Sequence, residues 1–260
     1  MFYESPFGPI FYLVHGSKDN PAIVFTHGGG LHSGMYDAQA AAFKHDYLVI
    51  TWDMQGHGQS APLKENLDVP QMADTLLGIM DEVGVEKTIA VGQSLGVYVN
   101  QHAALQQPDR IRALVNIGGL PIDVPMNPLE LLMFKALMPV SKLFPEKMLF
   151  KRTANEKTTT QEAQAFFKDS LHAMGKEQFL LMLGGQLDAC ELPVPEAPQQ
   201  PLLITHGEHE MPKSLIKANQ QWHESVPGSV YYEIPNAGHN ANQDNPEFFN
   251  EILREFITSL

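Results

Sequence analysis

Short apolar runs typical of β-strands alternate with helix-like segments along most of the chain. The strand-like runs are IFYLVH (10–15), AIVFT (22–26), YLVITW (47–52), TIAV (88–91), IRALVNIGG (111–119), PLLITHG (201–207) and SVYYEI (229–234). A helix is expected from Pro70 to Val83, capped by Asp68, and a closing helix over 246–259. Strands that alternate with helices pair mostly in parallel. The sequence therefore predicts an α/β fold, a mostly parallel sheet with helices on both faces.

The alternation stops between Pro121 and Pro201, where apolar residues instead recur at helical spacing. The two recurring sets are Leu129, Leu132, Met133, Ala136 and Leu137, and Ala163, Phe166, Phe167, Leu171 and Met174. We predict a core domain formed by 1–120 and 201–260, and a helical cap, 121–200, inserted over the carboxyl edge of the sheet. The proline-rich segment 191–201 is expected to be a stiff linker. Six of the twelve methionines lie in this cap, which suits either an apolar pocket or packing onto the core.

The net charge and the cysteine content limit which binding partners and which cellular compartment are expected. The formal net charge of -13 over 260 residues argues against binding to nucleic acid or to an anionic membrane, because both need basic patches. No run has the length of a membrane span, and the first residues lack the basic start of a signal peptide. The single cysteine, Cys190, excludes an internal disulfide and fits a reducing compartment, so a cytoplasmic location is expected. The sequence leaves a homo-oligomer open.

One serine stands between two glycines at a strand-to-helix seam, in Gly92-Gln93-Ser94-Leu95-Gly96. A strand that turns at once into a helix strains the turn residue, and glycines on either side avoid collisions. Such a turn holds a hydroxyl at the edge of the sheet, above the amides of a helix N-terminus. Ser94 is therefore the candidate nucleophile.

Three further motifs accompany this turn in order along the chain. His27-Gly28-Gly29-Gly30 follows the strand-like run 22–26, Asp53-Met54-Gln55-Gly56-His57-Gly58-Gln59-Ser60 follows 47–52, and Ala237-Gly238-His239 follows 229–234. With the serine turn, they make nearly the whole chain resemble the α/β-hydrolase superfamily. Gln55 departs from that family, which usually has arginine at this place; the arginine's role there is structural support. His57 is expected to be a structural turn residue.

The resemblance implies a serine nucleophile, a histidine base and an oxyanion hole. Imidazole can take the serine proton and return it to the leaving group, and His239 is the candidate for this step. The negative oxygen formed during attack needs preorganised donors. The serine turn supplies the amide of Leu95, and the resemblance implies that Gly29 supplies the second amide, with Gly30 as the alternative. No cofactor or metal is implied.

The acid that orients the histidine is less clearly marked. The family usually places an aspartate a few residues after the strand before the histidine's strand, and Glu210 occupies that position here. A glutamate can orient an imidazole and stabilise its positive charge. Asp123, after the run 111–119, is the alternative, and Glu208 is a weaker one. His206, His209 and Glu210 lie close together, but they form no zinc-binding pattern and we expect no metal there.

These features together predict a serine hydrolase. The expected activity is that of a carboxylesterase on small or medium acyl esters, with a small apolar acyl compound as substrate. Hydrolysis of carbon–carbon or amide bonds, and acyl transfer, use the same motifs and stay open. A small-molecule receptor of the same fold is the alternative outside enzymes. Epoxide hydrolases and haloalkane dehalogenases that resemble this fold carry aspartate where Ser94 stands, so neither is expected.

Overall fold

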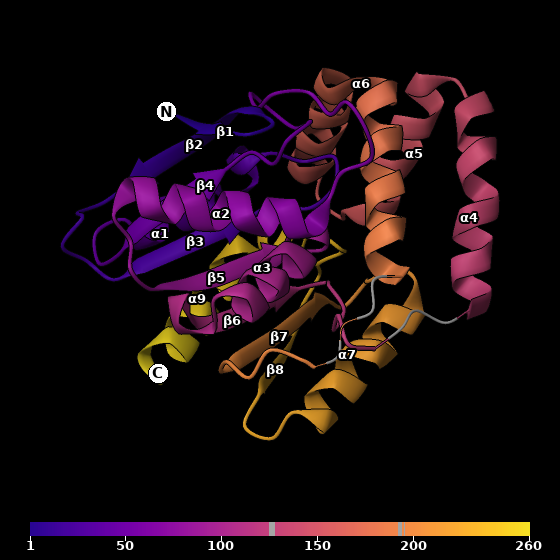
Figure 1. Ribbon diagram of the computed structural model, residues 1–260. Coiled ribbons are helices and arrows are strands. Elements are labelled where there is room, and N and C mark those ends of the chain that lie inside the picture. Colours follow the sequence, from indigo (N-terminus) through magenta and orange to yellow (C-terminus); the bar gives the residue numbers. More distant parts are fainter. Residues whose placement is uncertain (125–127, 192–193, 195) are drawn as a thin grey trace.

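The computed structural model describes residues 1–124, 128–191, 194 and 196–260, in which eight strands form one sheet (Figure 1). The strands are β1 (Phe2–Ser5), β2 (Gly8–His15), β3 (Ala22–Thr26), β4 (Leu48–Trp52), β5 (Thr88–Gln93), β6 (Ile111–Ile117), β7 (Leu202–Gly207) and β8 (Val230–Ile234). Their order in the sheet is β1-β2-β4-β3-β5-β6-β7-β8. Only β1 and β2 pair antiparallel with their neighbours, so the predicted mostly parallel sheet is confirmed.

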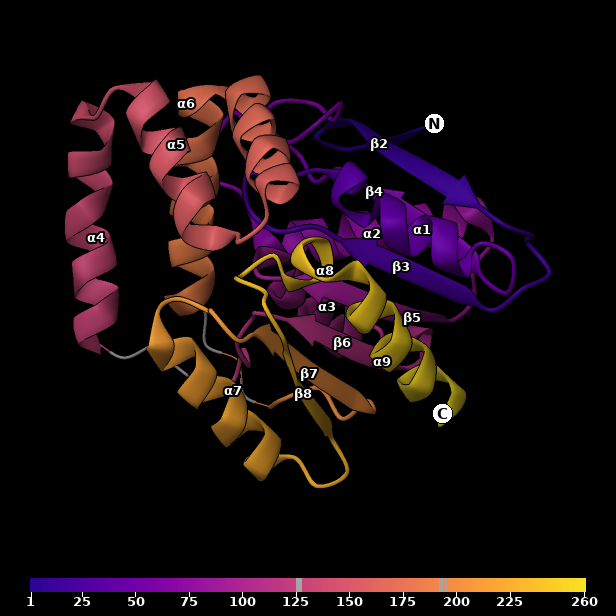
Figure 2. The same ribbon diagram turned by 180° about the vertical axis from the view of Figure 1, so that it is seen from behind.

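Helices cover both faces of this sheet. The core helices are α1 (Asp37–Phe43), α2 (Val69–Val83), α3 (Leu95–Gln106), α7 (Lys213–Ser225), α8 (Ala241–Asp244) and α9 (Pro246–Thr258), with short 3-10 helices at Ser33–Tyr36 and Pro108–Arg110. Helices α2 and α3 lie on one face, and α1 and α9 lie on the other (Figures 1 and 2). Strands β3, β4 and β5 and all but one residue of β6 are buried, because both of their faces are covered in this way.

The start and end of α2 follow directly from its sequence. The Asp68 carboxylate accepts the amide of Gln71 at 2.9 Å, which confirms the predicted cap. Pro70 lies in the first turn, where its missing amide proton costs no helical hydrogen bond. Gly84 ends the helix with φ 83°, a conformation that glycine adopts without strain.

Three helices separate β6 from β7: α4 (Pro128–Leu143), α5 (Glu146–Lys157) and α6 (Gln161–Glu191). They lie together beside the sheet, with α4 outermost (Figures 1 and 2). We call residues 128–191 the helical insertion. Gly175 interrupts α6 with φ 77° and ψ 159°, so its 31 residues form two helical arms. The helical character predicted for this stretch is confirmed.

Parts of the sequence-based description of this stretch fall outside the described residues. These are Met126, the side chain of Leu137, and residues 192, 193 and 195 of the expected linker. The division into two domains stays a prediction. Among the described residues, no helix combines the length and apolar character that crossing a membrane requires.

Candidate active site

Ser94 occupies a strained turn between β5 and α3. Its φ of 49° and ψ of -112° are rare for a residue with a side chain. The flanking glycines make the turn sterically allowed, because a Cβ on Gly96 would lie 2.2 Å from the Thr26 carbonyl oxygen. A Cβ on Gly92 would lie 2.7 Å from the backbone of Gly96. The sequence thus folds here into the turn expected from the Gly-x-Ser-x-Gly pattern.

The structure brings Glu210 and His239 together. Glu210 follows β7 and is fully buried; its Oε1 lies 2.9 Å from His239 Nδ1 and also accepts the Met211 amide at 3.0 Å. The alternative acids lie elsewhere. Asp123 is exposed and makes no described contact with His239, whereas Glu208 is exposed and accepts the Asn236 amide.

Burial and charge act in opposite directions on this pair. Burial opposes the ionisation of Glu210, but the neighbouring His239, with Lys157 and the Met211 amide, lowers the pKa of its carboxyl below the ordinary value. Burial likewise lowers the pKa of His239, although the Glu210 carboxylate partly offsets it. A carboxylate beside a neutral imidazole is the ground state that a general base requires.

Two further contacts link the serine turn to this pair. The Ser94 amide donates to the Ile117 carbonyl at 2.9 Å, and the next residue, Gly118, adopts φ 61°. A Cβ on Gly118 would lie 3.0 Å from both Glu210 Oε2 and His239 Nδ1. The last residue of β6 therefore contacts the serine turn, and the residue after it packs against the Glu210–His239 pair. Gln93 Nε2 donates to the His239 carbonyl at 3.1 Å. Sequence reasoning missed Gln93 and Gly118, since both act across long sequence separations.

Two histidines form hydrogen bonds that fix the loop after β3, His27–Gly30, which we call the glycine loop. His27 Nε2 accepts the Met54 amide at 2.9 Å, and His57 Nε2 accepts the Gly30 amide at 3.1 Å. In each ring the other nitrogen, Nδ1, faces a backbone carbonyl oxygen. The Gly30 amide therefore already donates its hydrogen bond, to His57. His57 has the structural role expected of it.

Burial lowers the pKa of both histidines to about 3, so both rings are neutral at physiological pH. Between pH 6.5 and about 3 the unfolded chain binds protons that the folded chain does not. Stability therefore falls as the pH drops through this window, by up to about 1.4 kcal/mol per pH unit for each histidine.

We expect the urea midpoint at pH 5 to lie well below that at pH 7, and His57→Gln to reduce this difference. Glutamine can accept the Gly30 amide without binding a proton. Equilibrium urea unfolding at the two pH values measures the effect. His45→Gln, at an exposed position, is the control and should keep the wild-type difference. An equal pH dependence in His57→Gln and wild type would contradict the assignment.

Hydrogen bonds also fix the Asp53–Ser60 segment that carries His57. Asp53 accepts the amides of Ser33 at 2.7 Å and Gln59 at 2.8 Å. Gln55, which departs from the family pattern, donates to the carbonyls of Pro62 and Phe7. Its side chain thus makes structural contacts.

The helical insertion is tied to the loop that carries His239. The Lys157 carbonyl accepts the His239 amide at 2.8 Å. The Asp244 carboxylate accepts the backbone amides of Thr159, Thr160 and Gly238 at about 3 Å. The turn between α5 and α6 and the histidine loop therefore share one hydrogen-bond network, which the sequence did not indicate.

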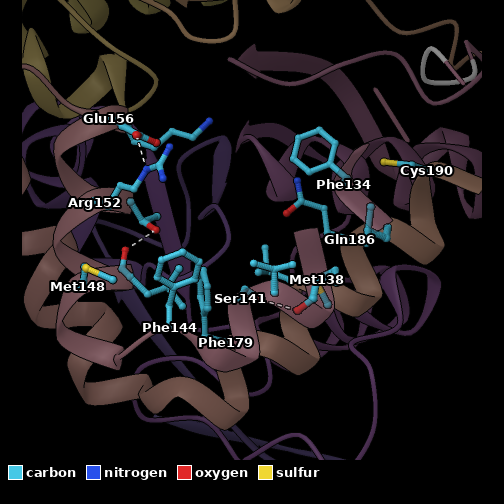
Figure 3. A pocket seen from close by; sticks show the side chains of 16 residues that line it. Phe134, Met138, Ser141, Phe144, Met148, Arg152, Glu156, Phe179, Gln186 and Cys190 are labelled. Atoms are coloured by element: carbon cyan, nitrogen blue, oxygen red, sulfur yellow. Dashed lines mark hydrogen bonds and ion pairs between the residues drawn. The ribbon is translucent and has the colours of Figure 1, made fainter. Parts of the chain in front are cut away.

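A cavity of about 420 Å³ lies among α4, α5 and α6 (Figure 3). Most of its lining is apolar, and includes Phe134, Met138, Phe144, Met148, Phe179 and Leu183. Gln186 from the same lining reaches the glycine loop, since a Cβ on Gly29 would lie 3.8 Å from its Oε1. Neither Met133 nor Phe167, from the predicted apolar faces, lines the cavity: Met133 is exposed, and Phe167 is buried against Gly30.

His206 near the end of β7, and His209 and Glu210 just after it, have different surroundings. His206 is buried and bonded to the Tyr231 hydroxyl, His209 is exposed, and Glu210 is bonded to His239. In the part of the chain that the structure describes, no three His, Cys, Asp or Glu side chains are grouped as metal ligands.

Comparison with known proteins extends over the whole chain. A putative carbamate hydrolase of Klebsiella pneumoniae is 26% identical over 254 residues, covering 92% of each chain. An uncharacterized carboxylesterase of Bacillus subtilis is 24% identical and covers 99% of this chain and 86% of its own. A thermophilic esterase of Thermogutta terrifontis has a similar structure, with a TM-score of 0.84, 19% identity and coverage of 100% and 98%.

A family model described as the alpha/beta hydrolase fold matches residues 21–246. The strand order of the sheet and the serine turn agree with this match. The chain belongs to the alpha/beta hydrolase fold family.

Proposed function

We propose that the chain is a serine carboxylesterase that cleaves small or medium acyl esters. The observation that carries the proposal is the buried 2.9 Å hydrogen bond between His239 Nδ1 and Glu210 Oε1, linked by Gly118 and Gln93 to the strained Ser94 turn. Nδ1 faces the carboxylate, so Nε2 is the atom left to accept a proton. The relatives named as hydrolases of esters and carbamates support the reaction class.

The proposed reaction begins with attack of Ser94 Oγ on the ester carbonyl carbon. His239 Nε2 takes the hydroxyl proton, and Glu210 stabilises the imidazolium that forms. The proton then passes to the leaving alkoxide as the carbon–oxygen bond breaks, which leaves an acyl-serine. Water, activated by the same imidazole, hydrolyses the acyl-serine and restores the hydroxyl.

The oxyanion is proposed to lie between the amides of Leu95 and Gly29. Leu95 begins α3, where the first amides have no helical acceptor. The Gly30 amide is engaged by His57, which favours Gly29 for the second donor. Each such donor contributes about 3–4 kcal/mol to transition-state stabilisation in a serine hydrolase.

Labelling and turnover together test the proposal. The protein should react with a fluorophosphonate probe and hydrolyse 4-nitrophenyl esters, whose release of 4-nitrophenolate is followed by absorbance. Labelling without turnover would favour a receptor that keeps the triad. Absence of both would contradict a serine hydrolase.

We also propose that residues 121–200 form a cap over a core of 1–120 and 201–260, with the acyl chain in the cavity of the insertion. Leu183→Trp fills part of this cavity, so we expect the preferred acyl chain to shorten by several carbons. The measurement is kcat/KM for 4-nitrophenyl esters from C2 to C12. Met133→Trp, at an exposed position of the same insertion, is the control. The same chain-length optimum in Leu183→Trp and wild type would show that the cavity does not hold the acyl chain.

A further inference from the structure

Lys157 contacts both the cavity, which it lines, and the loop of the candidate base, through its backbone. It is the last residue of α5, lines the cavity and is half-buried. Its carbonyl accepts the His239 amide at 2.8 Å, so its backbone lies directly beside the candidate base. Its Nζ donates to the Met211 carbonyl at 3.3 Å, in the residue after Glu210. The proposed ester chemistry makes no use of this ammonium group.

The charge of Lys157 is not matched by a close anion. The cavity lining contains two cationic side chains, and the other, Arg152, forms an ion pair with Glu156 at 2.7 Å. No carboxylate among the described residues lies within ion-pair distance of Lys157 Nζ. Burial lowers the pKa of Lys157, and the more distant Glu210 and Glu156 only partly offset it. An ammonium with three protons and one described acceptor has donors left for an anionic ligand.

The charge around this lysine also differs from that of the rest of the chain. Helices α4 and α5 hold six Lys or Arg against three Asp or Glu, whereas α6 holds two against five, so the helical insertion as a whole is neutral in a protein of net charge -13. A small anion is therefore repelled less strongly by the insertion than by the rest of the protein. An uncharged ester would gain nothing from this arrangement.

We propose that Lys157 binds a carboxylate carried by the ester substrate, whose preferred form is a mono-ester of an aliphatic dicarboxylic acid. Its methylene chain lies along the apolar wall, and its free carboxylate accepts hydrogen bonds from Nζ. This inference rests on the proposed esterase function and names its substrate class. Charge-assisted hydrogen bonds are about twice as strong as neutral ones, so one such contact can set specificity.

The test compares charged and uncharged esters of the same shape. The charged series is the monomethyl esters of C4 to C8 dicarboxylic acids. In each uncharged partner an isopropyl group replaces the carboxylate; monomethyl glutarate, for example, is paired with methyl 5-methylhexanoate. Proton release gives kcat/KM, and the ratio of charged to uncharged ester is the readout, because a general loss of activity cancels in it.

In wild type we expect the ratio to exceed one at the best chain length. Lys157→Gln should lower the ratio roughly tenfold or more, whereas Lys157→Arg, which keeps the charge, should retain most of it. Lys151→Gln, at an exposed position of the same helix, removes an equal charge and should keep the wild-type ratio.

Equal losses for both esters in Lys157→Gln would show that the side chain only supports the Met211 loop, and would overturn the inference. Wild type that cleaves uncharged esters with no preference for charged ones would overturn it as well, while leaving the esterase proposal intact. Wild type that cleaves neither series, nor 4-nitrophenyl esters, would overturn the esterase proposal and this inference with it.

Discussion

Replacing Ser94 with alanine is expected to lower ester turnover by about 10⁴- to 10⁶-fold and to abolish fluorophosphonate labelling. The acyl-enzyme cannot form without the hydroxyl, and residual activity would come only from binding and the oxyanion donors. The Ser94 side chain makes no described hydrogen bond that supports the fold, so the thermal midpoint should stay close to that of wild type. Initial rates with a 4-nitrophenyl ester, at matched circular dichroism, measure the effect.

Ser17→Ala is the matched control for this substitution, because Ser17 is exposed in the loop between β2 and β3. It should retain full turnover and labelling. A folded Ser94→Ala protein that still turns over esters at the wild-type rate would contradict the role of Ser94 as nucleophile.

The second large effect is expected from Glu210→Gln, which should lower kcat by about 10²- to 10⁴-fold. Glu210 Oε2 is buried without a described hydrogen-bond partner. Glutamine can therefore keep its Oε1 on His239 and Met211 and place its amide nitrogen where Oε2 stood. The variant keeps the shape of the side chain and removes its charge, so the imidazolium formed during attack loses its stabilising anion.

Asp123→Asn is the comparison, since it makes the same chemical change at the alternative acid. Asp123 is exposed and makes no described contact with His239. We therefore expect kcat to change by less than about twofold, as for an ordinary surface substitution. Steady-state rates of both variants, with folding checked by circular dichroism, decide between them. A larger loss in Asp123→Asn than in Glu210→Gln would move the acid to Asp123.

Sequence reasoning reached the fold because the parallel strands are short, apolar and bounded by turn residues. Strands β3, β4, β5 and β7 and all but one residue of β6 are buried, so their runs stand out as mainly apolar segments. The first strand, β1, was not predicted, since FYES is short and lies half-exposed at the edge of the sheet. The length of α6 was not predicted either, because Gly175 breaks its apolar periodicity in the middle.

Candidate residues of the site were predictable only where a local motif carries them. Ser94 and the two glycines of its turn lie within five consecutive residues, so the motif can be recognised directly in the sequence. The contacts of Gly30 with His57, Gln93 with His239, and the α5–α6 turn with Asp244 join residues 27 to 146 positions apart. No local pattern encodes such pairs. Met133 lies on a predicted apolar face but is exposed, because helical periodicity identifies such a face without showing whether another helix covers it.

The hydrogen bonds of Asp244 have a mechanical consequence for the entry of substrate. They fasten the helical insertion at the middle of its length to the loop of the proposed base. The insertion therefore cannot swing open as one rigid lid without displacing His239. A movement confined to α4, in contrast, would leave these hydrogen bonds of the α5–α6 turn intact. The base would then keep its alignment through each cycle of entry and release.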